Sequence, residues 1–478
     1  MSPESISVML WLLPEGGRKE MRGMARTTIL WALLALAGGL LLALYLPGSG
    51  VWAQTPDGVG SQAIVQLQKL EGSTTGWEDN FGWSMALDGD YLVVGAPHYT
   101  TTGATPGSAY IFKRDTASGS WTEVKQLLGD DGQPGDRFGY AVAISGDKVV
   151  VGAPWADVSG WQDAGAAYVF RRDKDGAGNW GLVTKLTASD VYTNNDHLGT
   201  AVAIDGNTIV VGAAEKEVNN IRDAGAVYVF TSSSLDNWSQ TAILTATTPY
   251  TQDLFGRAVT IDGNTIVVGA PWTNKGTQFD TGLAYVFYRS GDQWNQIKKL
   301  SASDSQPYDR FGTSLALDGD TLVVGAYQPG SSSGSVPPGP GAAYIFERNA
   351  SGTDQWGQRA KLNAAGGAQG DRFGFATQVA GDVVVVGAYL AEVAGDIYRG
   401  AAYAFERNAG GNNAWGQTAQ LVAQDGQVGD QFGFAVAAQG NTLVVGAPYA
   451  NRGGILNSGA AYLFFHAGYA IHLPVISR

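Results

Sequence analysis

The 478-residue sequence contains no cysteine. This absence excludes disulfide bonds, thiol catalysis, cysteine-ligated zinc and iron–sulfur clusters. Histidine is also scarce, and no two of His98, His197, His466 and His472 have the spacing of a metal site on one helix or hairpin. We therefore expect no bound metal, no cofactor and no serine–histidine catalytic pair.

Charged residues are few as well. They make up 15% of the chain, and their net charge is −13. Nucleic acids and anionic membranes are polyanions, so we expect neither as a partner. No long segment has helical periodicity, which argues against a helical solenoid. The sequence instead contains 67 glycines and 44% hydrophobic residues, which favours a large core joined by many tight turns.

The first residues indicate export. Arg26 precedes an apolar run from Ile29 to Leu46, and a small-x-Ala pattern ends at Ala53. This order predicts a signal peptide over residues 1–53, cleaved after Ala53, and hence a secreted or cell-surface protein. An uncleaved N-terminal membrane anchor is the alternative, because the apolar run is long enough to span a bilayer. Translation starting at Met21 or Met24 is a further alternative, because the residues before them fit neither reading.

One pattern recurs seven times over residues 61–464, with repeats starting near residues 79, 136, 196, 253, 309, 371 and 430. Each copy has an aspartate, then Phe-Gly two residues later (Leu198-Gly199 in the third copy). The glycine of Val-Val-Gly-Ala follows at a constant offset from the Phe, and Tyr-x-Phe comes next. A Trp-x5-Leu segment closes every copy except the last.

Each piece of the repeat reads as a strand. Phe138 to Ile144 alternates large and small residues, and Lys148 to Gly152 is a β-branched run typical of a buried strand. Asp-Gly or Ser-Gly between them predicts a tight hairpin. Four antiparallel strands repeated seven times predict an all-β, seven-bladed β-propeller. The recurrent glycine and alanine are explained by crowding where blades converge on an axis, and the aromatic residues by packing between blades.

The two ends of the repeat region predict how the ring closes. The last copy lacks its Trp-x5-Leu, while Ile64-x5-Leu70 precedes the first Phe-Gly at the spacing of a fourth strand. We expect this N-terminal strand to complete the last blade, which would leave no open edge between the first and last blades. Residues 465–478 lie outside the repeat as a C-terminal tail, either an added strand or a sorting element.

The repeat resembles the FG-GAP repeat of the integrin α-subunit propeller. The motif is carried by Phe-Gly followed by Val-Val-Gly-Ala-Pro, as at Gly152-Ala153-Pro154 and Gly446-Ala447-Pro448. The resemblance implies an extracellular recognition or adhesion role. Integrin-type repeats often carry a calcium loop between the first two strands, whereas this chain has short turns such as Asp88-Gly89-Asp90, with too few oxygens for calcium. We therefore predict no calcium there, and a propeller without integrin stalk or cytoplasmic parts.

The aspartate before each Phe-Gly could form a sevenfold ring of charge, but a residue repeated in every blade favours a structural role as a turn cap. A second aspartate precedes it in four copies, at Asp131, Asp190, Asp304 and Asp425. Paired carboxylates could hold a cation, and stabilisation of the loop is the reading we favour.

The connections between second and third strands vary, and variable loops on a rigid scaffold are where function resides. Exposed Trp and Tyr side chains stack on sugar rings and anchor protein interfaces. The candidate ligand-binding residues are therefore the aromatics of these loops: Tyr99, Trp155, Trp161, Trp272, Tyr327, Tyr389, Tyr398 and Tyr449. The alternative is that they cover the rim of the core.

The function we expect is a non-enzymatic binding module that recognises an extracellular glycan or protein through its loop face. One rival is a propeller hydrolase or lyase acting on a polysaccharide, which would need clustered acids. The loop acids Glu215, Glu217 and Glu392 are not paired by any pattern in the sequence, and Arg222, Arg399 and Arg452 are scattered. The other rival is a structural cell-surface element.

Overall fold

The structure is a computed structural model of the chain, and it describes residues 64–98, 105–234, 236–331, 333–350, 352 and 355–467. The predicted signal peptide, the candidate residue Tyr99 and the tail from residue 468 lie outside the described residues. The described part consists of strands joined by turns and loops, and it includes no helix of the length and apolarity that a membrane crossing requires.

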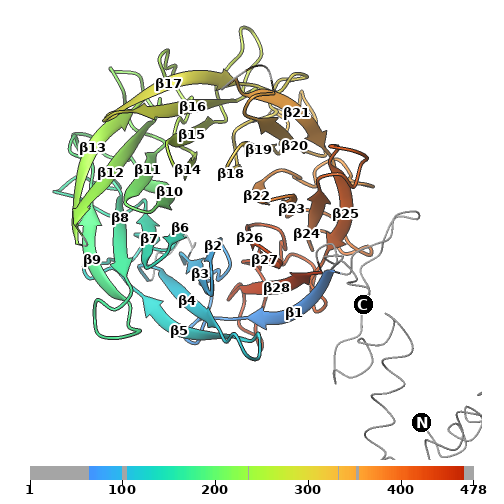
Figure 1. The fold of residues 1–478 in the computed structure, drawn as a ribbon, viewed down its shortest axis with the longest axis horizontal. Helices are drawn as coiled ribbons and strands as arrows, with labels where there is room; N and C mark the ends of the chain where they lie inside the picture. The colour runs from blue at the N-terminus through green and yellow to red at the C-terminus, as the bar shows by residue number, and fades with distance from the viewer. Residues whose placement is uncertain are drawn as a thin grey trace, which may run out of the picture. The chain divides into compact units, whose positions relative to one another are not determined.

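The strands form seven four-stranded antiparallel sheets arranged in a ring, as the sequence predicts (Figure 1). We number the blades in chain order and the strands of each blade from the innermost outward. The first three blades comprise β2 (Ser84–Asp88), β3 (Tyr91–Ala96), β4 (Ser108–Arg114), β5 (Trp121–Leu127); β6 (Ala141–Ser145), β7 (Lys148–Ala153), β8 (Ala166–Arg171), β9 (Gly181–Leu186); and β10 (Leu198–Asp205), β11 (Thr208–Ala213), β12 (Ala226–Ser234), β13 (Asn237–Leu244).

The next three blades comprise β14 (Ala258–Asp262), β15 (Thr265–Ala270), β16 (Leu283–Ser290), β17 (Gln293–Leu300); β18 (Leu315–Asp318), β19 (Thr321–Ala326), β20 (Ala342–Glu347), β21 (Gly357–Leu362); and β22 (Ala376–Ala380), β23 (Val383–Ala388), β24 (Ala401–Glu406), β25 (Gly416–Leu421). Blade 7 is built from β26 (Val436–Gln439), β27 (Thr442–Ala447), β28 (Ala460–His466) and β1 (Ile64–Leu70).

The N-terminal strand closes the ring, which confirms the prediction from the orphan fourth-strand pattern. β1 pairs antiparallel with β28, from Ile64 opposite His466 to Leu70 opposite Ala461. The first and last described strands therefore share one sheet, and separating blade 7 from blade 1 requires breaking this ladder. The strand β28 ends at His466, two residues beyond the end of the repeat region expected from the sequence.

Aromatic residues of the repeat pack each blade together. Phe138 contacts Tyr168 and Phe170 edge-on, with ring centroids 5.3 and 6.0 Å apart, and the same triplet recurs in every blade that has Phe-Gly. These rings are fully buried, and burial of one Phe contributes roughly 1.5–3 kcal/mol. The hydrophobic clusters cross from blade to blade, since Val93 and Ile111 of blade 1 pack with Phe138 of blade 2.

The glycine of Val-Val-Gly-Ala is explained by crowding at the contact between blades. A Cβ added at Gly152 would overlap the backbone carbonyl of Gly199 in the next blade, and one at Gly446 would overlap that of Gly82 in blade 1. The same overlap occurs at all seven positions, so this glycine allows the second strand of each blade to lie against the Phe-Gly turn of the next.

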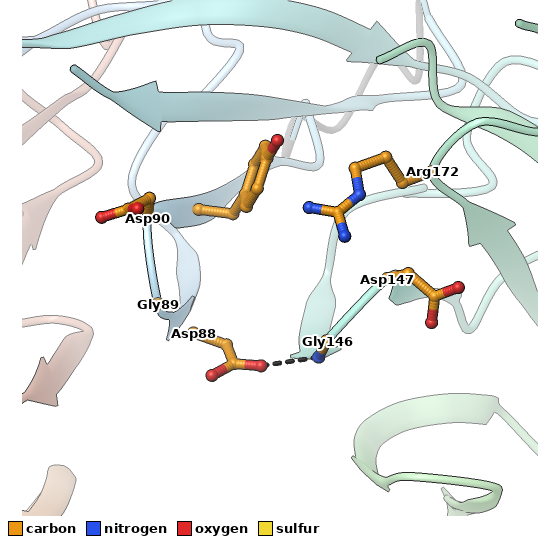
Figure 2. Close-up of a pocket in the computed structure, with 7 residues that line it drawn as sticks. Asp88, Gly89, Asp90, Gly146, Asp147 and Arg172 are labelled. Atoms are coloured by element: carbon orange, nitrogen blue, oxygen red, sulfur yellow. Dashed lines mark hydrogen bonds between the residues drawn. The ribbon is translucent and has the colours of Figure 1, made fainter. Parts of the chain in front are cut away.

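The turns between first and second strands are linked around the ring by hydrogen bonds. The backbone N–H of the turn glycine donates to a side chain of the corresponding turn in the preceding blade, as from Gly146 to Asp88 (2.6 Å, Figure 2) and from Gly381 to Asp318 (2.6 Å). We call this set the hairpin ring. Its donors are Gly89, Gly146, Gly206, Gly263, Gly319 and Gly381, and its acceptors are Gln439, Asp88, Ser145, Asp205, Asp262 and Asp318.

The hairpin ring is interrupted between blades 6 and 7, where Ala380 occupies the acceptor position and has no polar side-chain atom. A different contact joins these two blades. Nε2 of His466 lies 2.8 Å from Oε1 of Glu406, and both side chains are buried. The hydrogen bond to His466 lowers the pKa of Glu406. The corresponding positions of blades 5 and 6 hold Glu347 and Arg407, which also form an ion pair.

Candidate functional site: the loop face

The propeller has two chemically distinct ends. The connections between second and third strands contact those between blades, as where Arg310 N–H donates to the Asp280 carbonyl (3.0 Å). The hairpins between first and second strands contact those between third and fourth, as where Arg172 N–H donates to the Asp147 carbonyl (2.9 Å). We call the first end the loop face and the second the hairpin face.

The repeated aspartates of the loop face stabilise its turns, as we expected. In six blades a carboxylate oxygen of the aspartate before Phe-Gly accepts a hydrogen bond from the backbone N–H three residues earlier, as from Gln133 to Asp136 (2.9 Å). In the third, Asp196 accepts from the Thr193 hydroxyl (2.6 Å) instead. These carboxylates are turn caps rather than an open ring of charge.

The second aspartate of the loop also has a structural partner. Asp131 accepts hydrogen bonds from the Tyr168 hydroxyl and from Lys185 Nζ, each at 2.6 Å, and Asp304 is held in the same way by Tyr344 and Lys361. In blade 4 a threonine, Thr248, takes this position and accepts from Lys299 (3.0 Å). The described residues contain no group of three or more histidine and acidic side chains placed to hold a metal.

Backbone strain is concentrated at the residue before each Phe-Gly. All seven of these residues adopt left-handed conformations, with φ between 52° and 63°: Leu254, His197, Arg310, Arg137, Gln431, Asn80 and Arg372. A non-glycine residue there carries a conformational cost, and such strain clusters at functional sites. We did not predict these residues from the sequence. Their constant position directly before the Phe-Gly pair, next to positions whose side chains vary between blades, could have identified them.

Aromatic side chains form a continuous cluster where the innermost strands begin on the loop face. Trp83 lies 5.6 Å from Tyr140 and 4.6 Å from Phe434, and Phe434 lies 5.0 Å from Phe375 (ring centroids). Each comes two residues after the repeat Phe, and none was among the predicted candidates. The sequence signal was an aromatic residue at this position in blades 1, 2, 6 and 7, against Thr200, Arg257 and Thr313 in the others.

Four predicted residues join this cluster. Trp155 lies 5.3 Å from Tyr140, Tyr389 lies 4.5 Å from Phe375, and Tyr327 and Tyr449 contact Phe375 and Phe434. We call the set the aromatic rim: Trp83, Tyr140, Trp155, Tyr327, Phe375, Tyr389, Phe434 and Tyr449. All of its members are half-buried, so they cover the core and also present part of each ring to solvent.

Arginine and histidine side chains border the aromatic rim. The Arg137 guanidinium lies 3.9 Å from the centre of the Trp155 ring, and the Arg372 guanidinium lies 5.6 Å from that of Tyr327. Trp155 also contacts His197 (4.8 Å between ring centroids), which pairs with Glu215 (3.1 Å). Hydrogen bonding to His197 lowers the pKa of Glu215. Burial raises the pKa of Tyr389 to about 12, so this hydroxyl is neutral at physiological pH.

The remaining predicted residues lie apart from the aromatic rim. Trp161 and Tyr398 are exposed in the connections between second and third strands of blades 2 and 6. Trp272 lines a cavity on blade 4, where Arg310 lies between its ring and the rim residue Tyr327, 4.8 and 5.9 Å from the two ring centres. The structure therefore brings together four of the candidates and leaves Trp161, Tyr398 and Trp272 at separate places on the same face.

Exposed aromatic side chains distinguish the two faces. Six lie in loops of the loop face, and in the described residues none lies in a turn of the hairpin face: Trp77, Trp161, Tyr192, Tyr250, Phe279 and Tyr398. The hairpin face does have an open cavity of about 520 Å³ beside Asp88, Tyr91 and Arg172 (Figure 2). Several of its lining groups have partners, since Asp88 belongs to the hairpin ring, Asp90 pairs with Arg114, and the Arg172 guanidinium lies 5.1 Å from the centre of the Tyr91 ring.

The fold and loop face define a closed seven-bladed β-propeller with one end rich in aromatic residues. A family model described as the FG-GAP repeat matches residues 64–112, 121–170, 180–230, 238–287, 294–346, 356–405 and 415–464. The chain therefore belongs to the FG-GAP repeat family. Each matched segment begins with the fourth strand of one blade and continues into the first three strands of the next, which is why β1 belongs to blade 7.

The chain is also similar to a human protein, integrin alpha-E. The two are 28% identical over 167 residues, which cover 30% of this chain and 14% of integrin alpha-E. The chain thus matches only about a seventh of the length of this relative. The similarity agrees with the resemblance that Phe-Gly and Val-Val-Gly-Ala-Pro indicated.

Proposed function

We propose that this protein is an extracellular, non-enzymatic recognition module that binds a glycan or protein partner through its loop face. The concentration of partly exposed aromatic side chains on that face carries the proposal. Exposed aromatic clusters are unusual on soluble proteins and are typical of interaction surfaces. The likeness to integrin alpha-E supports a binding role in general. Export by the N-terminal segment, either as a cleaved signal peptide or as an anchor, is part of this proposal.

Binding to arrayed glycans and to a panel of purified extracellular proteins tests the proposal. The full-length chain is compared with Tyr192→Ser and Tyr398→Ser on the loop face and with Tyr288→Ser on β16, the third strand of blade 4, as a matched control. All three tyrosines are exposed, so these substitutions should leave the fold intact. We expect at least one partner whose binding weakens in a loop-face variant and is unchanged in the control. Absence of any partner, or weakening in the control alone, would contradict the proposal.

A polysaccharide hydrolase or lyase is the alternative function. It predicts turnover, so the same oligosaccharides incubated with the full-length chain would yield shorter products. Loss of that turnover in Glu392→Gln or Glu215→Gln would favour the enzyme. Binding without any product favours the recognition module.

A further inference from the structure

Blade 4 carries a cavity on the loop face that adjoins the aromatic rim through Arg310, which lines the cavity and donates a hydrogen bond to the rim residue Tyr327. Its volume is about 350 Å³, at the small end of the ~300–1,000 Å³ range of ligand pockets. Trp272, Asn274, Phe279 and Asp280 line it from one loop, and Gln252 and Arg310 line it from the two neighbouring connections. The lining residue Phe279 is 59% exposed. Tyr250, which precedes the lining residue Thr251, is 62% exposed.

The equivalent place in blade 2 is filled, which sets the blade 4 cavity apart. Trp155 has the same position after Gly-Ala-Pro as Trp272, but its ring packs against Tyr140, Arg137 and His197. Trp272 has a guanidinium over its ring, with Arg310 at 4.8 Å, and borders open space. Two tryptophans that the sequence motif makes equivalent therefore differ in what they offer a ligand.

Several polar groups of the cavity have no partner within the described residues. The Trp272 indole N–H, the Gln252 side-chain amide and Asp280 Oδ1 make no hydrogen bond there, whereas Asn274 Oδ1 is used by the Asp280 backbone N–H (2.9 Å). Arg310 is held by the Tyr327 hydroxyl (2.9 Å) and by Asp280 Oδ2 (3.4 Å). The cavity thus presents both donors and acceptors beside aromatic rings.

Charge and shape select the ligand class. The one cationic and one anionic side chain of the lining form an ion pair, so the cavity has little net charge. An aromatic wall with unpaired donors and acceptors suits a ring that has an apolar face and several hydroxyls. We propose that this cavity is a binding subsite for one neutral pyranose residue of a glycan. This inference rests on the proposed loop-face function and specifies the ligand class at one site.

Calorimetric titration of the full-length chain tests the subsite. The neutral probes are cellotetraose, mannotetraose and chitotetraose, and the anionic probes are oligogalacturonate and a heparin fragment. The variants are Phe279→Ser and Gln252→Asn. The matched control is Leu456→Ser, which has the same loop position in blade 7 as Phe279 and a similar exposure of 53%. We expect a neutral probe to bind and each cavity variant to weaken it about tenfold, with little change in the control.

Three results would overturn the subsite. A neutral probe bound equally by wild type and both cavity variants would place the sugar elsewhere; the loop-face function would then stand if Tyr192→Ser or Tyr398→Ser weakened that binding. Binding of anionic probes alone would show the wrong ligand class. If no oligosaccharide binds, the sugar inference fails, and the protein panel decides separately whether the loop face is a recognition surface.

Discussion

The hairpin face and the loop face of this propeller are built from the same seven repeats but use them differently. On the hairpin face, short polar turns link blade to blade through the hairpin ring, and Asp88 and Asp318 are occupied by glycine N–H groups. On the loop face, the capping aspartates and the backbone of the Phe-Gly turn repeat, while neighbouring side chains change, as from Trp83 to Thr200. The difference suggests that one end maintains the ring and the other end is free to vary for binding.

The largest effect should come from replacing the glycine of Val-Val-Gly-Ala, at which each blade packs against the next. In Gly152→Ala the added Cβ would overlap the Gly199 carbonyl of the next blade. Because the overlap is with backbone, no side-chain rotation can relieve it. We expect a loss of at least about 4 kcal/mol or failure to fold. Gly76→Ala is the control, because its Cβ would meet only Asp79 Oδ2 at 3.6 Å. Urea unfolding measures both, and similar stabilities for the two variants would contradict the crowding account.

The next effect concerns the seam where the hairpin ring is interrupted. His466→Ala would leave Glu406 buried without its partner and should cost about 3 kcal/mol at neutral pH. Since the hydrogen bond lowers the pKa of Glu406, the pair stabilises the fold above the ordinary glutamate pKa of about 4.3. That contribution should be lost as pH falls through the lower folded pKa. Thermal unfolding against pH checks this, and a constant difference down to pH 2 would be evidence against it.

Smaller effects should follow from single links of the hairpin ring. Asp318→Ala removes the acceptor for Gly381 N–H and should cost about 1 kcal/mol. Ala380→Asp supplies a carboxylate that can accept a hydrogen bond from the Gly440 N–H. It should stabilise the fold by about 0.5 kcal/mol. Denaturant midpoints of the two variants measure this. If Ala380→Asp destabilises by as much as Asp318→Ala, the ring links contribute little.

The last effect concerns Asp253 of blade 4, which makes the stability of the fold depend on pH. Burial raises the pKa of Asp253 to about 6, above the ordinary aspartate value of about 3.9. The folded state then binds more protons than the unfolded state between these values, so this group makes stability fall as pH rises from 4 to 6. Asp253→Asn should remove this decrease in stability. Unfolding free energies of both proteins at pH 4, 5 and 7 test this, with parallel curves as the contrary result.

The fold was predictable from the sequence because its causes repeat. Six Phe-Gly pairs, one Leu-Gly pair and seven copies of Val-Val-Gly-Ala predicted the strands, and the orphan segment at Ile64 predicted the closure that β1 makes with β28. The hairpin ring was not predictable, because its bonds join turns of different repeats. A gap such as Ala380 is visible only once the turns are known to be neighbours.

The candidate site was predictable only in part. Loop aromatics such as Trp155 and Tyr389 were recognisable, and the structure places them in the aromatic rim. Trp83 and Phe434 were missed because an aromatic residue next to a predicted strand is expected to be buried in the core. Trp155 and Trp272 looked equivalent in sequence, and only the packing of neighbouring loops separates a filled position from an open cavity.

The most direct test of the division between the two faces measures stability and binding in the same two variants. Phe279→Ser and Asp318→Ala are compared with wild type by thermal unfolding and by titration with a neutral tetrasaccharide that wild type binds. The account predicts that Phe279→Ser weakens binding about tenfold with an unchanged Tm, and that Asp318→Ala lowers Tm with unchanged binding. Weaker binding in Asp318→Ala, together with unchanged binding in Phe279→Ser, would contradict it.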